Sequence, residues 1–473
     1  MTTPSDTTTS SATRPMPDWM KGTMLAGFIV FLCWGGAISY WRTTRSAPGS
    51  AELALYLLGL PALLVLALFA GRRLLKLREA APAAPAPAPS TPVRQAQAAP
   101  AQAAPLAILA AALRSAHGAS PDELSAAIAA GRARADLDPE LVDDDGFPVM
   151  SVRSPDAVDE ALRDEISEWL AHNGMPDLPF SDEQWRALVL GTAVVEELAT
   201  QAGAQLMAGD GDPPMLRLLP LLPADWLETH RNAAAIWFEH AAARCGWPIE
   251  HIILAALDAI DLRTATPAVV LGHLAHEAAT RDARMTALVM ACASHIGDDT
   301  VARWSADGSL FTSKHPQGRI PGEGAAGLLL ADLPQARAIA GLQYALLEPV
   351  QEARREVSAD EARRADAAAL CKAAEHALKN AAAGENTVVK VVADTGHRSS
   401  RMLELMSFVV SAMPQLDESA DVLRVGEACG TCGTVPFLTG LAVAFHHVSQ
   451  DEECAMFVGN EELHRRYAIL IHP

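Results

Sequence analysis

Two uncharged stretches of nineteen residues near the N-terminus constrain this chain more than any other feature. Residues 23–41 read TMLAGFIVFLCWGGAISYW, and residues 53–71 read LALYLLGLPALLVLALFAG. As helices, each would cover about 28 Å, close to the roughly 30 Å hydrocarbon core of a bilayer. A cleaved signal peptide would explain only the first stretch, and a buried hairpin would carry a polar stripe. The sequence therefore predicts a transmembrane hairpin over residues 23–71.

The positive charges beside these stretches predict how the hairpin is oriented. Four Lys or Arg residues lie within residues 72–78, and residues 1–22 hold two more. Arg42 and Arg45 lie in the short connecting loop, but the larger excess is at the two outer flanks. Because positive flanks favour the cytoplasmic side, we expect both ends of the hairpin in the cytoplasm. The prediction is a multi-pass protein of a bacterial inner membrane with a cytoplasmic tail at 1–22.

A proline-rich tract separates the hairpin from the rest of the chain. Residues 81–105 contain seven prolines among alanines, which favours an extended spacer. We assign residues 72–105 to a basic flank and linker, and 106–473 to one folded body. Residues 1–78 carry a net +5 and the whole chain −20, so the remainder carries −25. A body this acidic argues against nucleic-acid binding, which requires clustered Lys and Arg.

The body alternates strand and helix signals. Residues 106–131 predict a strand, a turn and a helix, because Ser120 and Glu123 form a capping box around Pro121 and Gly131 ends the helix. Further apolar strand-like runs occupy 252–255, 287–291, 388–393, 422–425, 455–458 and 467–471, and amphipathic helix patterns cover 335–355, 361–382, 399–412 and 434–447. This alternation predicts a layered α/β fold.

Several glycine-rich segments resemble the β-ketoacyl-ACP synthases of the thiolase-like superfamily. GRIPGEGAAGLLL at 318–330 resembles the GEGAA segment of that family. VVADTGHRSSRMLE at 391–404 resembles the strand, catalytic-histidine turn and helix that open its second half. GEACGTCGTVPFLTGLAVAF at 426–445 resembles its glycine-rich GHT segment and the following helix. Residues 106–131 look like the opening strand and helix, whereas 135–240 are hard to place.

The resemblance implies a fold, an assembly and a set of framework residues. The fold would be a thiolase-like layered α/β structure of two pseudo-twofold related halves, at about 106–335 and 336–473. The family usually pairs into homodimers. The framework glycines of the resembled segments fall at Gly322, Gly324, Gly426, Gly430 and Gly433.

The positions that carry condensing chemistry in this family are replaced in this chain. The family uses a cysteine thiolate at a helix N-terminus and two histidines. Alignment places Thr266 at the cysteine position, Asp394 at the first histidine turn and Glu427 at the second histidine. The phenylalanine–glycine loop corresponds to 459–466 and retains only its first glycine. The resemblance therefore implies a protein that has lost condensing activity, and we expect no cofactor.

Two residues could still be nucleophile or base. Cys292 lies in ACAS, which resembles a nucleophile motif, but only thirty residues separate it from Glu323. We therefore favour a buried strand position for Cys292. His397, three residues after Asp394, is either a displaced catalytic histidine or a surface or capping residue at a helix start, and we favour the second interpretation.

Three motifs resemble metal sites only in part. Cys429 and Cys432 form a C-x-x-C that could be redox-active or half a zinc site, but no second such motif exists, so a glycine-rich turn is favoured. Residues 143–146 resemble a fragment of a calcium loop without its ligand spacing. His273 and His276 share a helix face, where ordinary helix histidines are the commoner case. We predict no metal.

Two functions follow from these observations. The first is a membrane-anchored, catalytically inactive synthase-like protein that binds an unidentified protein as an adapter or assembly factor, in a bacterial envelope or secretion complex. The alternative is a divergent acyl-binding or acyl-transferring enzyme in which Asp394, His397 and Glu427 serve as acid and base groups. Formation of a covalent acyl adduct would distinguish the second from the first.

Overall fold

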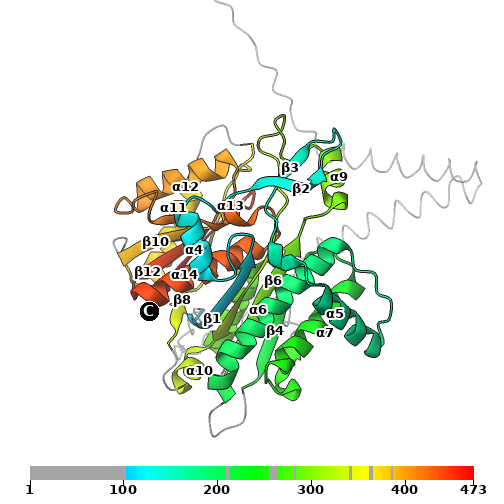
Figure 1. Cartoon of the computed structure of the whole chain (residues 1–473). Coiled ribbons are helices and arrows are strands. Elements are labelled where there is room, and N and C mark those ends of the chain that lie inside the picture. Colours follow the sequence, from blue (N-terminus) through cyan, green and yellow to red (C-terminus); the bar gives the residue numbers. More distant parts are fainter. Residues whose placement is uncertain are drawn as a thin grey trace, which may run out of the picture. The chain divides into compact units, whose positions relative to one another are not determined.

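The computed structural model describes residues 103–473 apart from short internal gaps (Figure 1). The gaps are 208–213, 255–260, 263, 282–283, 340–342, 362–365 and 385–386. The predicted hairpin at 23–71 lies outside the described residues. Within the described part of the chain, no helix is both long and apolar enough to cross a bilayer.

A single mixed sheet, built from two halves of the same design, runs through the domain. The first half has the order β5 (Ile252–Leu254), β4 (Leu216–Leu221), β6 (Thr286–Ser294), β7 (Glu323–Ala331) and β1 (Leu106–Ser115). The second has the order β11 (Val422–Arg424), β10 (Val388–Ala393), β12 (Cys454–Gly459), β13 (Arg465–His472) and β8 (Ala345–Leu347), with β9 (Gln351–Arg354) paired to β13. In each half three parallel strands are followed by two antiparallel ones. The halves join where β1 pairs with β8.

Helices cover both faces of this sheet (Figure 1). One face packs on α8 (Pro267–Thr280) and α14 (Val435–Asp451). The other packs on α5 (Glu160–His172), α6 (Asp182–Met207) and α7 (Glu228–Arg244) in the first half, and on α11 (Ala368–Asn380) and α12 (Ser399–Ala412) in the second. Both faces of the central strands are apolar. In β6, for example, Val289 packs toward α8 and α14, and Leu288 packs toward α5, α6 and α7. Strands buried on both faces read as continuous apolar runs.

Shorter elements complete the domain. They are α4 (Pro121–Ala129), β2 (Asp136–Val142), β3 (Pro148–Ser151), η2 (Pro155–Ala157), η3 (Ile249–His251), α9 (Asp298–Ala306), α10 (Leu333–Ala338) and α13 (Val425–Cys429). The hydroxyl of Ser120 accepts the N–H of Glu123 at 3.2 Å, and the carboxylate of Glu123 accepts the N–H of Ala119 at 2.8 Å. Gly131 has φ +66° just beyond the helix end. The predicted caps of α4 are therefore confirmed.

One predicted helix is wrong. The pattern over 335–355 favours a helix, but α10 ends at Ala338 and the strands β8 and β9 follow. Pro349 interrupts the pattern, and β8 hydrogen-bonds to β1 and β13 on either side. Sheet pairing thus overrides the helix propensity of this Ala- and Leu-rich stretch. By contrast, the strand predicted at 388–393 and the helix predicted at 399–412 coincide with β10 and α12.

Candidate functional site

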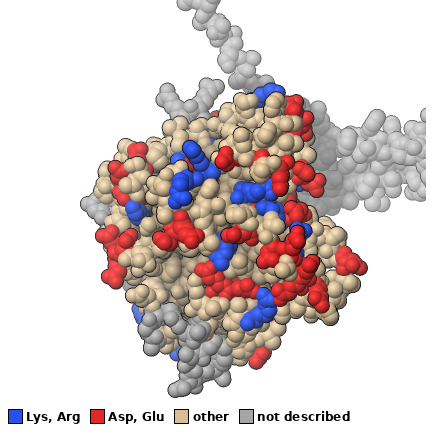
Figure 2. Space-filling view, in the orientation of Figure 1, with Lys and Arg blue, Asp and Glu red and all other residues tan. Residues whose placement is uncertain are grey.

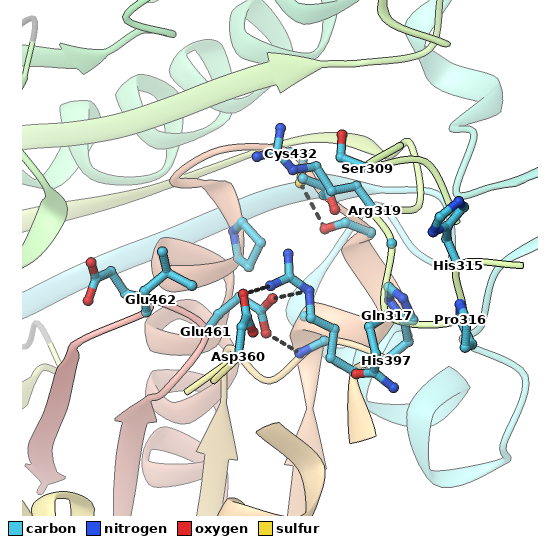
Figure 3. Close-up of a pocket in the computed structure, with 18 of the residues that line it drawn as sticks. Ser309, His315, Pro316, Gln317, Arg319, Asp360, His397, Cys432, Glu461 and Glu462 are labelled. Carbon is cyan, nitrogen blue, oxygen red and sulfur yellow. Dashed lines mark hydrogen bonds and ion pairs between the residues drawn. The ribbon is translucent and has the colours of Figure 1, made fainter. Parts of the chain in front are cut away.

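A cavity of about 680 Å³ opens beside the N-terminal end of α14 (Figure 3). Most of its lining comes from four segments: the loop 308–319 after α9, the turn 394–398 after β10, the turn 426–433 before α14, and the loop 461–463 between β12 and β13. Asp360 and Pro436 complete it. The turns that follow β10 and β12 leave the sheet at the carboxyl ends of two parallel strands. Ligands of α/β proteins usually bind at such strand ends.

Asp394 links the turn after β10 to the loop after β12 by hydrogen bonds. Its Oδ1 accepts the N–H of Asn460 at 2.7 Å and the N–H of Glu461 at 3.1 Å. Burial raises the pKa of Asp394 to about 7, the charge of Glu461 acts in the same direction, and the two N–H bonds oppose them. Beside it, Thr395 donates to the side-chain oxygen of Asn460 at 2.6 Å. The carboxyl group of Asp394 is therefore engaged in holding the two loops together.

A group of paired charges forms another part of the cavity wall. Arg401 lies 2.9 Å from Asp360, and its Nε donates to the backbone oxygen of Glu461 at 3.2 Å. Arg398 lies between the same two acids, 3.4 Å from Asp360 and 3.6 Å from Glu461. Figure 3 shows Asp360 and Glu461 close together at this wall. Because the two arginines face two carboxylates, this wall presents little net charge to a ligand.

His397 faces the cavity from the turn before α12. Its ring lies edge-on to Phe311, with centroids 5.3 Å apart. Burial lowers the pKa of His397, so the ring is neutral at pH 7. The N-cap of α12 is Arg398, and His397 is half-buried. His397 thus precedes the N-cap of α12 rather than capping it, and it lines the cavity.

The C-x-x-C turn forms part of the cavity wall, and both of its cysteines are buried. Cys429 and Cys432 are each 1% exposed, and the backbone of Gly430 and Gly433 has φ +64°, which favours glycine. Contact with Cys429 and burial raise the pKa of the Cys432 thiol. Among the described residues, no group of three or more His, Cys, Asp or Glu could hold a metal ion. The geometry is that of a tight, buried turn, and the raised pKa keeps the Cys432 thiol protonated.

Three further framework glycines lie where backbones approach closely. A Cβ on Gly322 would lie 2.1 Å from the backbone oxygen of Cys429, and one on Gly426 would lie 1.9 Å from that of Asp394. A Cβ on Gly324 would lie 2.9 Å from the oxygen of Arg114. The Gly426 contact joins two segments that line the cavity, and the Gly322 contact joins one of them to the residues before β7. A side chain at Gly322 or Gly426 would therefore separate those segments.

The two remaining degenerate positions do not line the cavity. Thr266 is the N-cap of α8, and its hydroxyl accepts the N–H of Val269 at 3.4 Å. Glu427 forms an ion pair with Arg424 at 2.7 Å. Of the four residues singled out from the sequence, the structure brings only Asp394 and His397 into one cavity. Asp360 and Glu461 were not singled out, because nothing in their local sequence marks them as cavity residues.

The other candidate sites have structural explanations. Cys292 is 1% exposed within β6, and burial raises the pKa of its thiol to about 12. The buried-strand interpretation is confirmed. The carboxylate of Asp143 accepts the N–H groups of Asp145 and Phe147, which makes residues 143–146 a self-capped acidic turn. On α8, Glu277 pairs with Arg217 at 2.6 Å.

Comparison with known proteins shows the fold but no close relative. No family model matches the sequence, and no curated protein matches it. A ketosynthase from module 1 of the bacillaene synthase of Bacillus amyloliquefaciens FZB42 superposes with a TM-score of 0.51 at 13% identity, covering 78% of this chain and 72% of that one. The ishigamide ketosynthase/chain length factor superposes with a TM-score of 0.49 at 15% identity, covering 77% of this chain and 99% of that one. A β-ketoacyl synthase from Burkholderia phymatum STM815 superposes with a TM-score of 0.48 at 13% identity, covering 78% of this chain and 99% of that one.

These likenesses, at such low identity, concern the fold alone. The described domain has the mixed α/β, thiolase-like fold of ketosynthases, as the resemblance in the sequence predicted.

Proposed function

We propose that this chain is a membrane-anchored ketosynthase-like protein that does not condense acyl groups and acts as a protein-binding adapter or assembly factor. One observation supports the loss of chemistry above all. At the family's catalytic positions, the Thr266 hydroxyl caps a helix, Glu427 pairs with Arg424, and the Asp394 carboxylate holds two loops together. Each side chain is engaged in structure, and only that of Asp394 lines the cavity.

The cavity also lacks an activated nucleophile among its described residues. Covalent acyl transfer requires a group with a lowered pKa or an adjacent base. Cys432 is the one thiol in the cavity lining, and its pKa is raised. His397 lines the same cavity, yet its Nε2 has no hydrogen-bond partner in the described structure. His315 also lines the cavity, but neither histidine lies beside an activated thiolate among the described residues.

The surface favours proteins over nucleic acids as partners. Figure 2 shows Asp and Glu gathered over α5 and α6. On α5 they include the exposed side chains of Glu160, Asp164, Glu165 and Glu168. Such a surface repels phosphates. The predicted hairpin at 23–71 would hold this domain at the membrane, in an envelope or secretion complex.

Acyl thioesters test the loss of chemistry. The full chain in detergent is incubated with acetyl-, malonyl- and long-chain acyl thioesters, beside an active β-ketoacyl synthase. Intact mass and thiol release are then measured. We expect neither an adduct nor release above the buffer rate. An adduct at a defined residue would instead establish the divergent acyl-transferring enzyme.

Membrane cross-linking tests the adapter role. Cells expressing the tagged chain are cross-linked before solubilisation, and a variant lacking residues 1–97 serves as the control for anchoring. We expect a defined protein to be retained by the anchored chain. If no protein is retained above an unrelated membrane protein, the adapter proposal fails, whatever the thioester assay gives.

A further inference from the structure

Helix α12 has an outer face without charge, although it lies at the surface of the domain beside α11 (Figure 1). The structure describes every residue of this helix, and none that is exposed or partly exposed carries a charge. Its two charged residues both point inward, since Arg401 is 0% exposed and Glu404 is 1% exposed. A helix that covers a core ordinarily directs its charged residues toward water. In α12 the charges are on the opposite side.

The inward charges of α12 have structural partners. Arg466 donates to both carboxylate oxygens of Glu404, at 2.7 and 2.9 Å, and Arg355 lies 2.9 Å from the same group. Arg401 lies 2.9 Å from Asp360. These pairs explain why charge is found on the inner side of the helix. They do not explain why the side that faces water has none.

Apolar side chains form a row along this outer face, which we call the α12 stripe. Leu403 is 54% exposed, Val410 is 63% exposed, and Met406 is partly exposed between them. Positions i, i+3 and i+7 share one side of a helix, so the three side chains form a row about 10 Å long. The exposed residues beside the stripe, Ser399 and Ser411, are small and uncharged. The stripe therefore offers a smooth apolar surface on which another helix can pack.

The neighbouring helix α11 shows the ordinary distribution of charge. Helices α11 and α12 pack on the same core of the second half. The exposed side chains of α11 include Lys372, Glu375, His376 and Lys379. The α12 stripe is therefore not a general property of this layer of helices. Exposed apolar side chains gathered on one element mark interaction sites more often than scattered ones do.

Acidic side chains follow the C-terminal end of α12. Asp417 and Glu418 are both exposed in the segment that follows the helix, and Asp421 beyond them pairs with Lys390 at 2.9 Å. The C-terminal end of a helix already carries partial negative charge, and these acids add to it. This end of α12 therefore attracts a positive group and repels an anionic lipid surface.

We propose that the α12 stripe binds the apolar face of an amphipathic helix from a partner protein, which lies antiparallel to α12 with a basic end near Glu418. This inference rests on the proposed adapter function and gives it a surface and a class of partner. An antiparallel helix places the positive end of its own dipole over the negative end of α12. Helices are recognised through apolar side chains at i, i+3 and i+7, which is the spacing of the stripe.

The size of the stripe sets the strength of this contact. A stable interface buries about 1,600 Å² in total, which is more than one row of three side chains supplies. We therefore expect a dissociation constant in the micromolar range or above, with rapid exchange of the partner.

Site-specific photo-cross-linking tests where the partner binds. Benzoylphenylalanine replaces Leu403 or Val410 in the full chain, and it replaces Lys372 or Lys379 on α11 as the control. Cells are irradiated, adducts are purified under denaturing conditions, and the cross-linked peptides are sequenced by mass spectrometry. We expect adducts at both α12 positions and none above background at the α11 positions. The captured segment should have apolar residues at helical spacing and Lys or Arg at one end.

Other results of this experiment would overturn the inference. They are adducts with a second copy of this chain, with its own N-terminal segments or with lipid, and equal capture at α11 and α12. Absence of adducts at 403 and 410 would also overturn it. If general cross-linking still retains a protein in that case, the adapter proposal stands and its binding surface lies elsewhere. If general cross-linking retains none, the adapter proposal fails as well.

A synthetic peptide with the captured sequence then measures the contribution of the stripe. Leu403→Ser with Val410→Ser is compared with Lys372→Ser with Lys379→Ser, in the full chain in detergent. All four side chains are exposed, so we expect both variants to keep the wild-type melting temperature. The α12 pair should weaken peptide binding at least about tenfold, because two apolar side chains lose buried area, and the α11 pair should leave it unchanged. Equal affinities of the two variants would refute the stripe as the binding site.

Reversal of one charge tests the orientation of the bound helix. Glu418→Lys changes an exposed acid beyond α12, and Glu375→Lys on α11 is the matched control. Asp417 is left intact because it accepts the N–H groups of Ser419 and Ala420. We expect Glu418→Lys to weaken peptide binding about threefold at low salt and less at high salt, and the control to leave it unchanged. Equal binding by the two variants would show that the basic end does not lie near Glu418.

Discussion

The carboxylate of Glu323 and the guanidinium of Arg186 form a buried two-pronged ion pair, with N–O distances of 2.6 and 2.8 Å. Glu323 begins β7 and Arg186 lies on α6. The backbone N–H of Ser154 and the hydroxyl of Ser294 donate to the same carboxylate, at 2.7 and 2.9 Å. Both carboxylate oxygens are therefore satisfied without water. This pair ties the glycine-rich strand to a helix from the segment that the sequence left unplaced.

Removing one member of this pair should be far worse than removing both. Glu323→Leu or Arg186→Met leaves an uncompensated buried charge, and we expect each to reduce the free energy of unfolding by about 3–5 kcal/mol. The double variant should lose clearly less than either single variant, because it leaves no unpaired buried charge. Denaturant unfolding of all four proteins gives the coupling energy directly. Additive losses would show that the two side chains do not interact in solution.

Gly426 should not tolerate even a methyl group. A Cβ there would lie 1.9 Å from the backbone oxygen of Asp394, so Gly426→Ala must separate two loops of the cavity. We expect a loss of more than about 3 kcal/mol or no folded protein. Gly272→Ala is the matched control, because nothing lies within 4 Å of its Cβ position on α8. That change should be neutral or stabilising by up to about 1 kcal/mol. Equal melting temperatures for the two variants would contradict the close approach.

The central strands and their following helices could be predicted because local signals and tertiary structure agree there. Strand β10 contains four valines, interrupted only by Lys390, and α12 follows after a short turn with one glycine. After α10, local signals and tertiary structure conflict: helix propensity favours a helix over 345–354, but sheet pairing makes this stretch two strands. The segment 135–240 has no glycine-rich landmark, so its helices acquire their positions only by packing on the sheet.

Cavity residues could be predicted from the sequence only where the course of the backbone alone decides their position. Asp394 and His397 follow the end of a buried strand, so their turn had to lie at the edge of the sheet. The direction of a side chain is not determined in this way. Glu427 has Arg424 three residues before it and pairs with it, away from the cavity. Asp360 reaches the cavity from more than thirty residues upstream, and no local pattern encodes that contact.

The rate of alkylation should differ between buried and partly exposed cysteines. Cys292, Cys429 and Cys432 are each 1% exposed, and burial raises the pKa of Cys292 to about 12. Since only thiolates react, we expect these three to remain unmodified by iodoacetamide at pH 8 in the folded chain. The partly exposed cysteines, Cys245, Cys371 and Cys454, should react before the three buried ones. Peptide mass spectrometry with and without denaturant measures this. Fast modification of Cys432 would revive the nucleophile hypothesis for the cavity.

Asp394 should make the protein less stable as the pH rises from about 4 to about 7. Its folded-state pKa is about 7, whereas the carboxyl of an unfolded chain ionises near pH 4. Between these values the folded protein holds a proton that the unfolded chain has released, so the free energy of unfolding falls with increasing pH. Above pH 7 both states are ionised and the penalty is constant. The loss is on the order of 4 kcal/mol, from a difference of about three pKa units at about 1.4 kcal/mol each.

The variant Asp394→Asn isolates this contribution. Its side-chain oxygen can still accept the N–H groups of Asn460 and Glu461, but it does not ionise. Buried histidines such as His397, with lowered pKa values, give the opposite slope below about pH 6.5, and they are present in both proteins. The difference in unfolding free energy between variant and wild type should therefore grow in favour of the variant from pH 4 to 7 and then level off. Parallel stability curves for the two proteins would show that Asp394 ionises normally in the folded state, and that solvent reaches its carboxyl group through the cavity.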